Sequence, residues 1–245
     1  MNPLSDHSKP VHGVWTLINS LDVLGVLCMS DLDFVVLDWE HGAWGASDSD
    51  TATLLAHGMG VAVVIRVPAP TAAIVQRAAD TGADAIQFAS MRSLDNFELM
   101  VQSSVCPPDG LRGYSPWSYR SKTTKESNSN PLLIPQIESV AGINTLFSLP
   151  ETIINQIDTI FVGRFDLSVD LGLPGDINSE SVTEALKKVV EFSNRYGKRV
   201  GTVALDLADA NKMSEMGFGY ITLSSDREIL AEKTDSLFGP KRLFL

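Results

Sequence analysis

Eight short runs rich in β-branched residues recur along the chain and alternate with longer stretches of helical period. Such alternation is typical of βαβ units, which build a parallel sheet. Helical patterns lie between the runs, for example over residues 71–82, 93–104 and 179–197, and Gly197 stands where a C-cap glycine is expected. The predicted strands cover residues 13–17, 33–38, 61–66, 84–89, 132–138, 159–163, 199–205 and 220–224.

Eight strand-helix units in 245 residues average about 31 residues each, which is the size expected of a (β/α)₈ TIM barrel. No linker interrupts the units, so we predict a single α/β domain over residues 1–245. The one irregular region is residues 106–130, which are too polar and too numerous for an ordinary connection. We expect this segment to be a functional loop or lid, with a flexible surface insertion as the alternative.

Composition excludes several classes of protein. The chain is 44% hydrophobic but has no apolar run long enough to span a bilayer, which argues against a membrane protein. A formal charge of −11, spread along the chain, argues against a nucleic-acid partner. Cys28 and Cys106 suggest neither a disulfide framework nor a metal site, and the polar N-terminus has no signal pattern, so we expect a cytoplasmic protein.

Polar residues stand where the buried strands should end. Asp38 and Arg66 close the second and third runs, Gln136 and Glu138 close the fifth, and Asp166 follows the sixth. In a barrel of this kind, residues at the C-terminal strand ends face the mouth of the active site. The pairs 38/66 and 138/166 are each 28 residues apart, about one βα unit, so each pair should come from neighbouring strands.

The chemistry of these groups points to enolate formation. Glu138 and Asp166 could hold one hard divalent cation, with water or substrate oxygens completing its coordination. Arg66 would add a second positive charge beside the same oxygen. His41 is the natural proton carrier because its ordinary pKa lies near neutrality, and Asp38, three residues earlier, could orient its ring.

Each residue also has a purely structural interpretation. A strand-end aspartate such as Asp38 often caps the next helix, and Arg66 could form an ion pair at the barrel rim. Trp15 in the first strand could be core or substrate wall. His7, His12 and His57 look structural or exposed. Matching chemistry at several strand ends is what favours a catalytic site.

The motifs GVWTLINS, DFVVLDWEHG, VVIRVP, TGADAIQF, CPPDGLRG, PQIES and VGRFDLSVDLG resemble, in order and spacing, the HpcH/HpaI aldolase family. These are metal-dependent class II aldolases that cleave to, or condense from, pyruvate. The likeness runs from about Gly13 to Asp226. It implies a TIM barrel, with Mg²⁺, Mn²⁺ or Co²⁺ bound by Glu138 and Asp166.

By the same resemblance, His41 and Asp38 match the catalytic pair, and Arg66 matches the arginine beside the enolate oxygen. Pyruvate would be held by Gln136 and by the backbone of 163–165. The complete expected substrate contacts are Gln136, Arg66, Gly163, Arg164, Phe165 and Trp15. The sequence departs from the family pattern at Phe88, Ala89 and Ser90, and at Arg164, where proline is usual.

The resemblance also implies a homo-oligomer, a trimer or hexamer, with the C-terminal segment exchanged between subunits. The expected reaction is reversible cleavage of a 4-hydroxy-2-oxo acid to pyruvate, or a similar 2-oxo acid, and an aldehyde. A decarboxylase of 2-oxo acids, or a lyase of the malyl or citramalyl type, would use the same enolate chemistry. A barrel that binds a small acid without turnover is the alternative from outside the enzymes.

Overall fold

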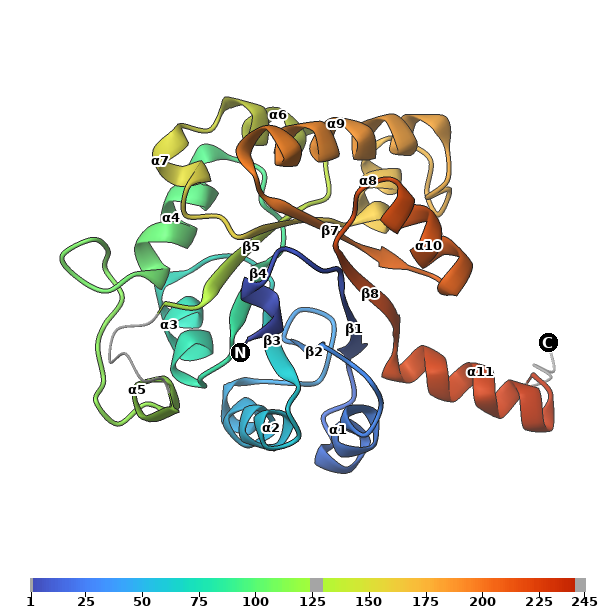
Figure 1. Cartoon of the computed structure of the whole chain (residues 1–245), viewed down its shortest axis with the longest axis horizontal. Coiled ribbons are helices and arrows are strands. Elements are labelled where there is room, and N and C mark those ends of the chain that lie inside the picture. The colour runs from blue at the N-terminus through green and yellow to red at the C-terminus, as the bar shows by residue number, and fades with distance from the viewer. Residues whose placement is uncertain (1, 124–129, 241–245) are drawn as a thin grey trace.

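The computed structural model describes residues 2–123 and 130–240, and it confirms a closed barrel of eight parallel strands in chain order (Figure 1). Each strand agrees with its predicted range to within two residues at either end. The strands are β1 (Val11–Thr16), β2 (Phe34–Asp38), β3 (Ala62–Val67), β4 (Ala85–Phe88), β5 (Leu132–Ile137), β6 (Thr159–Val162), β7 (Arg199–Ala204) and β8 (Tyr220–Ser225).

Helices cover the outside of the barrel, as Figure 1 shows. Several of them begin at a serine, threonine or aspartate whose side chain accepts a hydrogen bond from the first turn, such as Thr71, Ser139 and Asp206. The helices are η1 (Pro3–Ser5), α1 (Leu21–Cys28), α2 (Ala46–Gly58), α3 (Ala72–Asp80), α4 (Leu94–Ser104), α5 (Tyr119–Thr123), α6 (Val140–Ser148), α7 (Glu151–Ile154), α8 (Arg164–Asp170), α9 (Glu180–Tyr196), α10 (Leu207–Glu215) and α11 (Asp226–Phe238).

Side chains fill the interior of the barrel. The Phe34 and Tyr220 rings stack with centroids 4.3 Å apart, and Phe161 meets Tyr220 edge-on at 6.0 Å. Gly13 leaves room for this cluster, because a Cβ there would lie 2.4 Å from the Phe34 ring. A second, larger layer of buried aliphatic residues fills the space between strands and helices. The packed interior leaves the strand ends as the place for a site.

The long segment between α4 and β5 does not form the expected lid. It connects a helix to the following strand, so it lies at the end of the barrel where strands begin. Its described residues pack there: Arg120 donates to the carbonyls of Ala79 and Ala83, and the Gly113 amide donates to Gln76. The expectation of a lid over the active site is therefore wrong for these residues, and residues 124–129 lie outside the described part.

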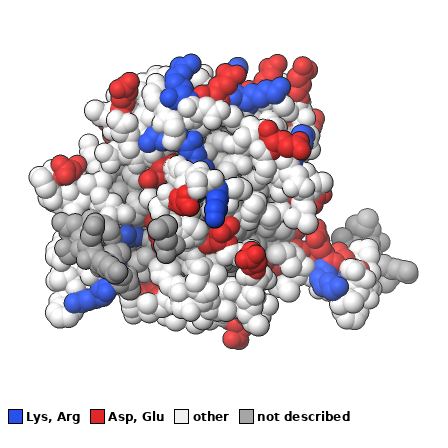
Figure 2. Space-filling view, in the orientation of Figure 1, with Lys and Arg blue, Asp and Glu red and all other residues white. Residues whose placement is uncertain are grey.

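The C-terminal helix α11 leaves the barrel and projects away from it (Figure 1). Its apolar residues Ile229, Leu230, Leu237 and Phe238 are exposed. No helix in residues 2–123 and 130–240 combines the length and apolarity needed to cross a bilayer. On the face shown in Figure 2, the described acidic and basic side chains are interspersed.

Candidate active site

A cavity of about 290 Å³ opens at the C-terminal ends of the strands. Eight of the predicted site residues line it, and they come from β1, β2, β3, β5 and the segments that follow β2 and β6. Glu138 and Arg164 are the predicted residues that do not line it directly. The lining residues are Trp15, Leu17, Asp38, His41, Arg66, Gln136, Phe161, Gly163, Phe165, Asp166, Val203 and Ser225.

Asp38 and Arg66 form a buried, two-pronged ion pair at the floor of this cavity. The strands place them opposite each other in the β2–β3 register. Arg66 Nε donates to Asp38 Oδ1 at 2.8 Å, and Arg66 Nη2 donates to Oδ2 at 2.6 Å. The Asp38 side chain is fully buried, and the guanidinium carbon lies 4.3 Å from the centre of the Trp15 ring. Trp15 therefore supports the arginine as well as lining the cavity.

Glu40 is a third member of this group. Its Oε2 lies 3.1 Å from Arg66 Nη1, so the arginine bridges two carboxylates. Burial raises the pKa of Glu40, and the nearby Glu138 and Asp38 also raise it, while Arg66 and His41 act in the opposite direction. Arg66 has five N–H groups, and these contacts engage three, so it keeps donors for a ligand.

The structure corrects the expected contact between Asp38 and His41. Asp38 bonds to Arg66 and to the Glu40 amide, and the nearest carboxylate oxygen recorded for His41 is Glu40 Oε2, 4.0 Å from its Nε2. The His41 side chain is 68% exposed at the cavity mouth. The reason is the turn after β2, which rotates His41 away from the strand-end side chain. An exposed imidazole at the mouth remains suited to exchanging protons with a ligand.

A chain of buried amides leads from the barrel interior to Glu138. Gln87 Nε2 donates to Gln136 Oε1 at 2.6 Å, and Gln136 Nε2 in turn donates to Glu138 Oε2. Gln87 and Gln136 are both buried, and the Tyr220 hydroxyl lies 3.5 Å from Gln87 Oε1. This chain fixes the orientation of the Gln136 amide, which presents its N–H₂ group toward the site.

The other Glu138 oxygen is held by Ser90. Glu138 Oε1 accepts the Ser90 amide at 2.8 Å and the Ser90 hydroxyl at 3.2 Å. Ser90 adopts a left-handed conformation with φ of 58°, which turns both donors toward the carboxylate. Gly163 packs on the same carboxylate: a Cβ there would lie 3.1 Å from Glu138 Cβ and 3.2 Å from Oε2. Ser90, where the sequence departs from the family pattern, thus makes a direct contact with Glu138.

The donors at this position suit a hard divalent cation. Glu138 is 5% exposed, and no lysine, arginine or histidine nitrogen of the described residues lies within 4.0 Å of it, so its charge is uncompensated by an ion pair. Asp166 follows the neighbouring strand β6 and faces the cavity. Across residues 2–123 and 130–240 no group of three or more acidic, histidine or cysteine side chains forms a complete metal site. Water or substrate would therefore have to complete the coordination of a cation.

The Arg164 side chain turns away from the cavity. It is fully buried, and its guanidinium pairs with Asp209 and donates to the Val203 carbonyl at 2.6 Å. The pKa of Asp209 is lowered: burial acts to raise it, but hydrogen bonds from Arg164 and the Leu205 amide outweigh burial. A substrate contact at Arg164 would therefore involve only its backbone. Helix α8 begins at Arg164 even though this residue replaces the proline of the family pattern.

Sequence reasoning missed the roles of Gln87, Glu40 and Asp226. Asp226 is buried and accepts the amides of Leu17 and Ile18, which holds the loop after β1 against the cavity. The sequence does indicate a role for Gln87, because it is the one amide side chain in the apolar run DAIQFA. No comparable signal marks Glu40, because its contact with Arg66 depends on the turn after β2.

The chain is similar to known proteins along most of its length. Residues 12–232 match the family model described as HpcH/HpaI aldolase/citrate lyase. The chain is 29% identical over 232 residues to the 5-keto-4-deoxy-D-glucarate aldolase of Escherichia coli K12, covering 92% of this chain and 90% of that one. It is 28% identical to the hydroxypyruvate/pyruvate aldolase of Paraburkholderia phytofirmans, covering 92% of each.

A solved structure has the same barrel fold. The barrel superposes on an HpcH/HpaI aldolase/citrate lyase family protein from Burkholderia cenocepacia J2315 with a TM-score of 0.85. The two chains are 29% identical, and the match covers 96% of this chain and 95% of the other.

Proposed function

Because the chain belongs to the HpcH/HpaI aldolase/citrate lyase family and is a carbon-carbon lyase, we propose that it cleaves a 4-hydroxy-2-oxo acid to pyruvate, or a similar 2-oxo acid, and an aldehyde. The observation that carries the proposal is the cavity in which Arg66, Gln136 and Asp166 converge beside the buried Glu138. This set suits an acid whose 2-oxo oxygen gains negative charge when the C3–C4 bond breaks.

Arg66 supplies a fixed positive charge for that oxygen. Its guanidinium is held on three sides, by Asp38, Glu40 and the Trp15 ring, and its free N–H groups are available to the cavity. Such preorganisation matters because donors that need no rearrangement stabilise developing charge best. Gln136 offers one further N–H, directed by its bond to Gln87.

His41 is the proposed proton carrier. It lines the cavity, and the Oε2 of its neighbour Glu40 lies 4.0 Å from its Nε2, so the carboxylate can stabilise the imidazolium that forms when His41 takes a proton. In the cleavage direction, His41 would take the proton of the C4 hydroxyl as the C3–C4 bond breaks. In the reverse direction it would return that proton to the new alkoxide.

Glu138 and Asp166 are the residues that would hold a divalent cation, Mg²⁺, Mn²⁺ or Co²⁺. When bound, such a cation supplies a Lewis acid that draws electron density from the 2-oxo and carboxylate oxygens. The protein's own contribution is to hold Glu138 with Ser90 and Gln136 donors, which leaves the carboxylate oriented before any cation arrives.

Deuterium exchange into the methyl group of pyruvate tests the proposal before any aldehyde is known. Purified protein is incubated with pyruvate in D₂O with Mn²⁺ or Mg²⁺ and after EDTA, and loss of the methyl proton signal is followed by NMR. We expect exchange that depends on the cation and is lost in Glu138→Gln. No exchange by protein that demonstrably binds the cation would refute enolate formation from pyruvate.

A malyl- or citramalyl-type lyase is the second candidate, since the matching family model also covers citrate lyase. Such an enzyme would break a carbon-carbon bond in the acyl group of a coenzyme A thioester, so release of a shorter coenzyme A thioester distinguishes it from an aldolase. A 2-oxo acid decarboxylase would instead release carbon dioxide from oxaloacetate without an aldehyde. Analysis of the products from a 4-hydroxy-2-oxo acid, a coenzyme A thioester and oxaloacetate separates the three reactions.

We also propose a homo-oligomer, a trimer or hexamer, in which α11 packs on a neighbouring subunit. The support is the projection of α11 and the exposure of Ile229, Leu230, Leu237 and Phe238 along it (Figure 1). Light scattering coupled to size-exclusion chromatography measures the mass. Truncation after Glu228, which keeps the Asp226 contacts with Leu17 and Ile18, is expected to lower the number of subunits. A monomeric full-length chain would contradict the proposal.

A further inference from the structure

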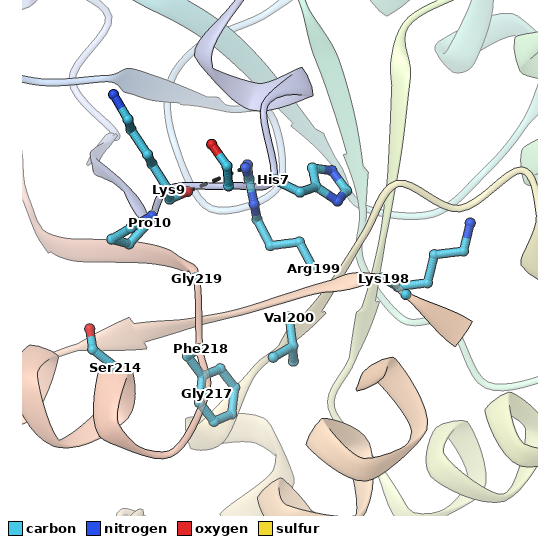
Figure 3. A pocket seen from close by; sticks show the side chains of 12 residues that line it. His7, Lys9, Pro10, Lys198, Arg199, Val200, Ser214, Gly217, Phe218 and Gly219 are labelled. Carbon is cyan, nitrogen blue, oxygen red and sulfur yellow. Dashed lines mark hydrogen bonds between the residues drawn. The ribbon is translucent and has the colours of Figure 1, made fainter. Parts of the chain in front are cut away.

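A second cavity, of about 400 Å³, lies at the opposite end of the barrel from the active site (Figure 3). It is bounded by the N-terminal segment 7–10, by the start of β7 and by the turn before β8. Its walls include His7, Lys9, Lys198 and Arg199, and none of the residues that line it is acidic. Three basic side chains, Lys9, Lys198 and Arg199, therefore share one cavity in a chain whose formal charge is −11. Burial lowers the pKa of Lys198, and the charge of Asp158 acts in the opposite direction.

Arg199 stands at the centre of this basic pocket. Its side chain is nearly buried and donates to the carbonyl oxygens of Leu4, Asp6 and Lys9, the last of which Figure 3 shows as a dashed line. Burial lowers the pKa of Arg199, while Asp6, Tyr220 and Asp33 partly offset that effect. Among the described residues, no carboxylate oxygen lies within 4.0 Å of its guanidinium. Carbonyl dipoles therefore fix the group without a direct ion pair to a carboxylate.

The two lysines lie on opposite sides of the pocket, as Figure 3 shows. Lys198 Nζ donates to the Ile157 carbonyl at 2.7 Å and to the Asn155 carbonyl at 3.3 Å, so it too is held by neutral acceptors. Lys9 is exposed, and its long side chain can turn into or out of the pocket. Neither amine has a carboxylate within 4.0 Å in the described part of the chain.

The pKa of His7 responds to the positive charges around the pocket. Burial lowers its pKa, and the charges of Arg199 and Lys198 lower it further, with Asp6 acting weakly in the opposite direction. The neighbouring acids are hydrogen-bonded to other groups: Asp6 accepts from Ser8, Asp158 accepts the Leu133 amide, and Asp33 accepts the His12 amide. None of the three lines the pocket, so an anion that enters it would contact the basic side chains without displacing an internal ion pair.

We propose that this basic pocket binds a small polyanion, a molecule that carries a phosphate or two or more carboxylates, at a site separate from the active site. Arg199 would provide the fixed charge, and Lys9 and Lys198 would close on the anion from either side. The Ser214 hydroxyl, which also lines the pocket, would add a neutral donor. The separation is set by the fold, because Arg199 begins β7 while the active site lies where the strands end.

Isothermal titration of cation-free protein with inorganic pyrophosphate, at 0.1 M ionic strength, tests the proposal directly. Tricarballylate is titrated in parallel, and the tighter of the two identifies the anion class. We expect saturable binding that weakens as salt is added. In NMR titrations, the pKa of His7 should rise when the anion binds, while the imidazole resonances of His41 in the active site should stay where they are.

The variants Lys9→Ala and Lys198→Ala, singly and together, locate the bound anion. Removal of both charges should weaken pyrophosphate binding about tenfold, since a partly exposed charge contributes up to about a factor of five. Lys9→Arg should keep wild-type affinity. The matched control is Lys187→Ala/Lys188→Ala on the exposed face of α9, which makes the same change in net charge far from the pocket.

Three outcomes would overturn the proposal: no saturable binding of either anion, equal weakening in the control pair, or a shift of the His41 imidazole resonances in place of those of His7. Lys9→Ala keeps the test decisive if Lys198→Ala is poorly folded, because no side-chain hydrogen bond of Lys9 exists to be lost among the described residues.

Discussion

Asp38→Asn tests how the active-site arginine is held. The variant keeps the shape of the side chain but removes a fully buried negative charge that accepts two hydrogen bonds from Arg66, at 2.8 and 2.6 Å. Breaking one side of a buried ion pair costs about 3–5 kcal/mol. Arg66 keeps Glu40 at 3.1 Å, so we expect the lower end, a loss of about 3 kcal/mol in the free energy of unfolding.

The loss is measured by urea unfolding followed by tryptophan fluorescence, at one fixed protein concentration. In thermal unfolding it corresponds to a fall in Tm of about 6–12 °C for a chain of this size. The matched control is Asp31→Asn, because Asp31 is exposed and the same chemical change there should cost less than about 0.5 kcal/mol.

A double-mutant cycle completes the test. If Asp38 and Arg66 act as one unit, Arg66→Met in the Asp38→Asn background should cost much less than Arg66→Met in the wild type. Additive losses, or a loss below about 1 kcal/mol in Asp38→Asn alone, would refute the assignment of this pair as the anchor of the arginine.

Three further changes probe the site. His41→Ala should lower the retro-aldol rate at least about 100-fold while pyruvate affinity changes little, and equal loss of both would remove His41 from the proton-carrier role. Burial raises the pKa of Glu40, so the folded state binds its proton more tightly than the unfolded state does; its contribution to stability therefore declines as pH rises from the ordinary glutamate range through the raised pKa. Glu40→Gln should abolish that decline in the free energy of unfolding measured against pH, whereas an unchanged decline would show that another group controls it. Gly163→Ala would place a Cβ 3.2 Å from Glu138 Oε2, so Mn²⁺ binding, followed by electron paramagnetic resonance, should weaken, while Gly58→Ala, with nothing within 4 Å, should leave it unaltered.

The barrel could be predicted from the sequence because its signal is local. Each strand is a short apolar run bounded by polar residues, and eight such runs at about one βα unit apart leave few other folds. The strand-end positions followed from the same pattern, and four of the residues found in this way, Asp38, Arg66, Gln136 and Asp166, line one cavity. The same pattern also argues against a lid at residues 106–130. This segment follows a predicted helix and precedes a predicted strand, so it lies at the end of the barrel away from the active site.

Which side chains contact one another within the site depends on the tertiary structure. Residue types and spacing suggested that Asp38 would serve His41, but the β2–β3 register places Asp38 opposite Arg66, and the turn after β2 carries His41 to the rim. Arg164 is paired with Asp209 in the same way, across elements that are far apart in the chain. The physical reason is that periodicity specifies the face on which a side chain lies, whereas its partner depends on the strand register and backbone turns that form only when the barrel closes.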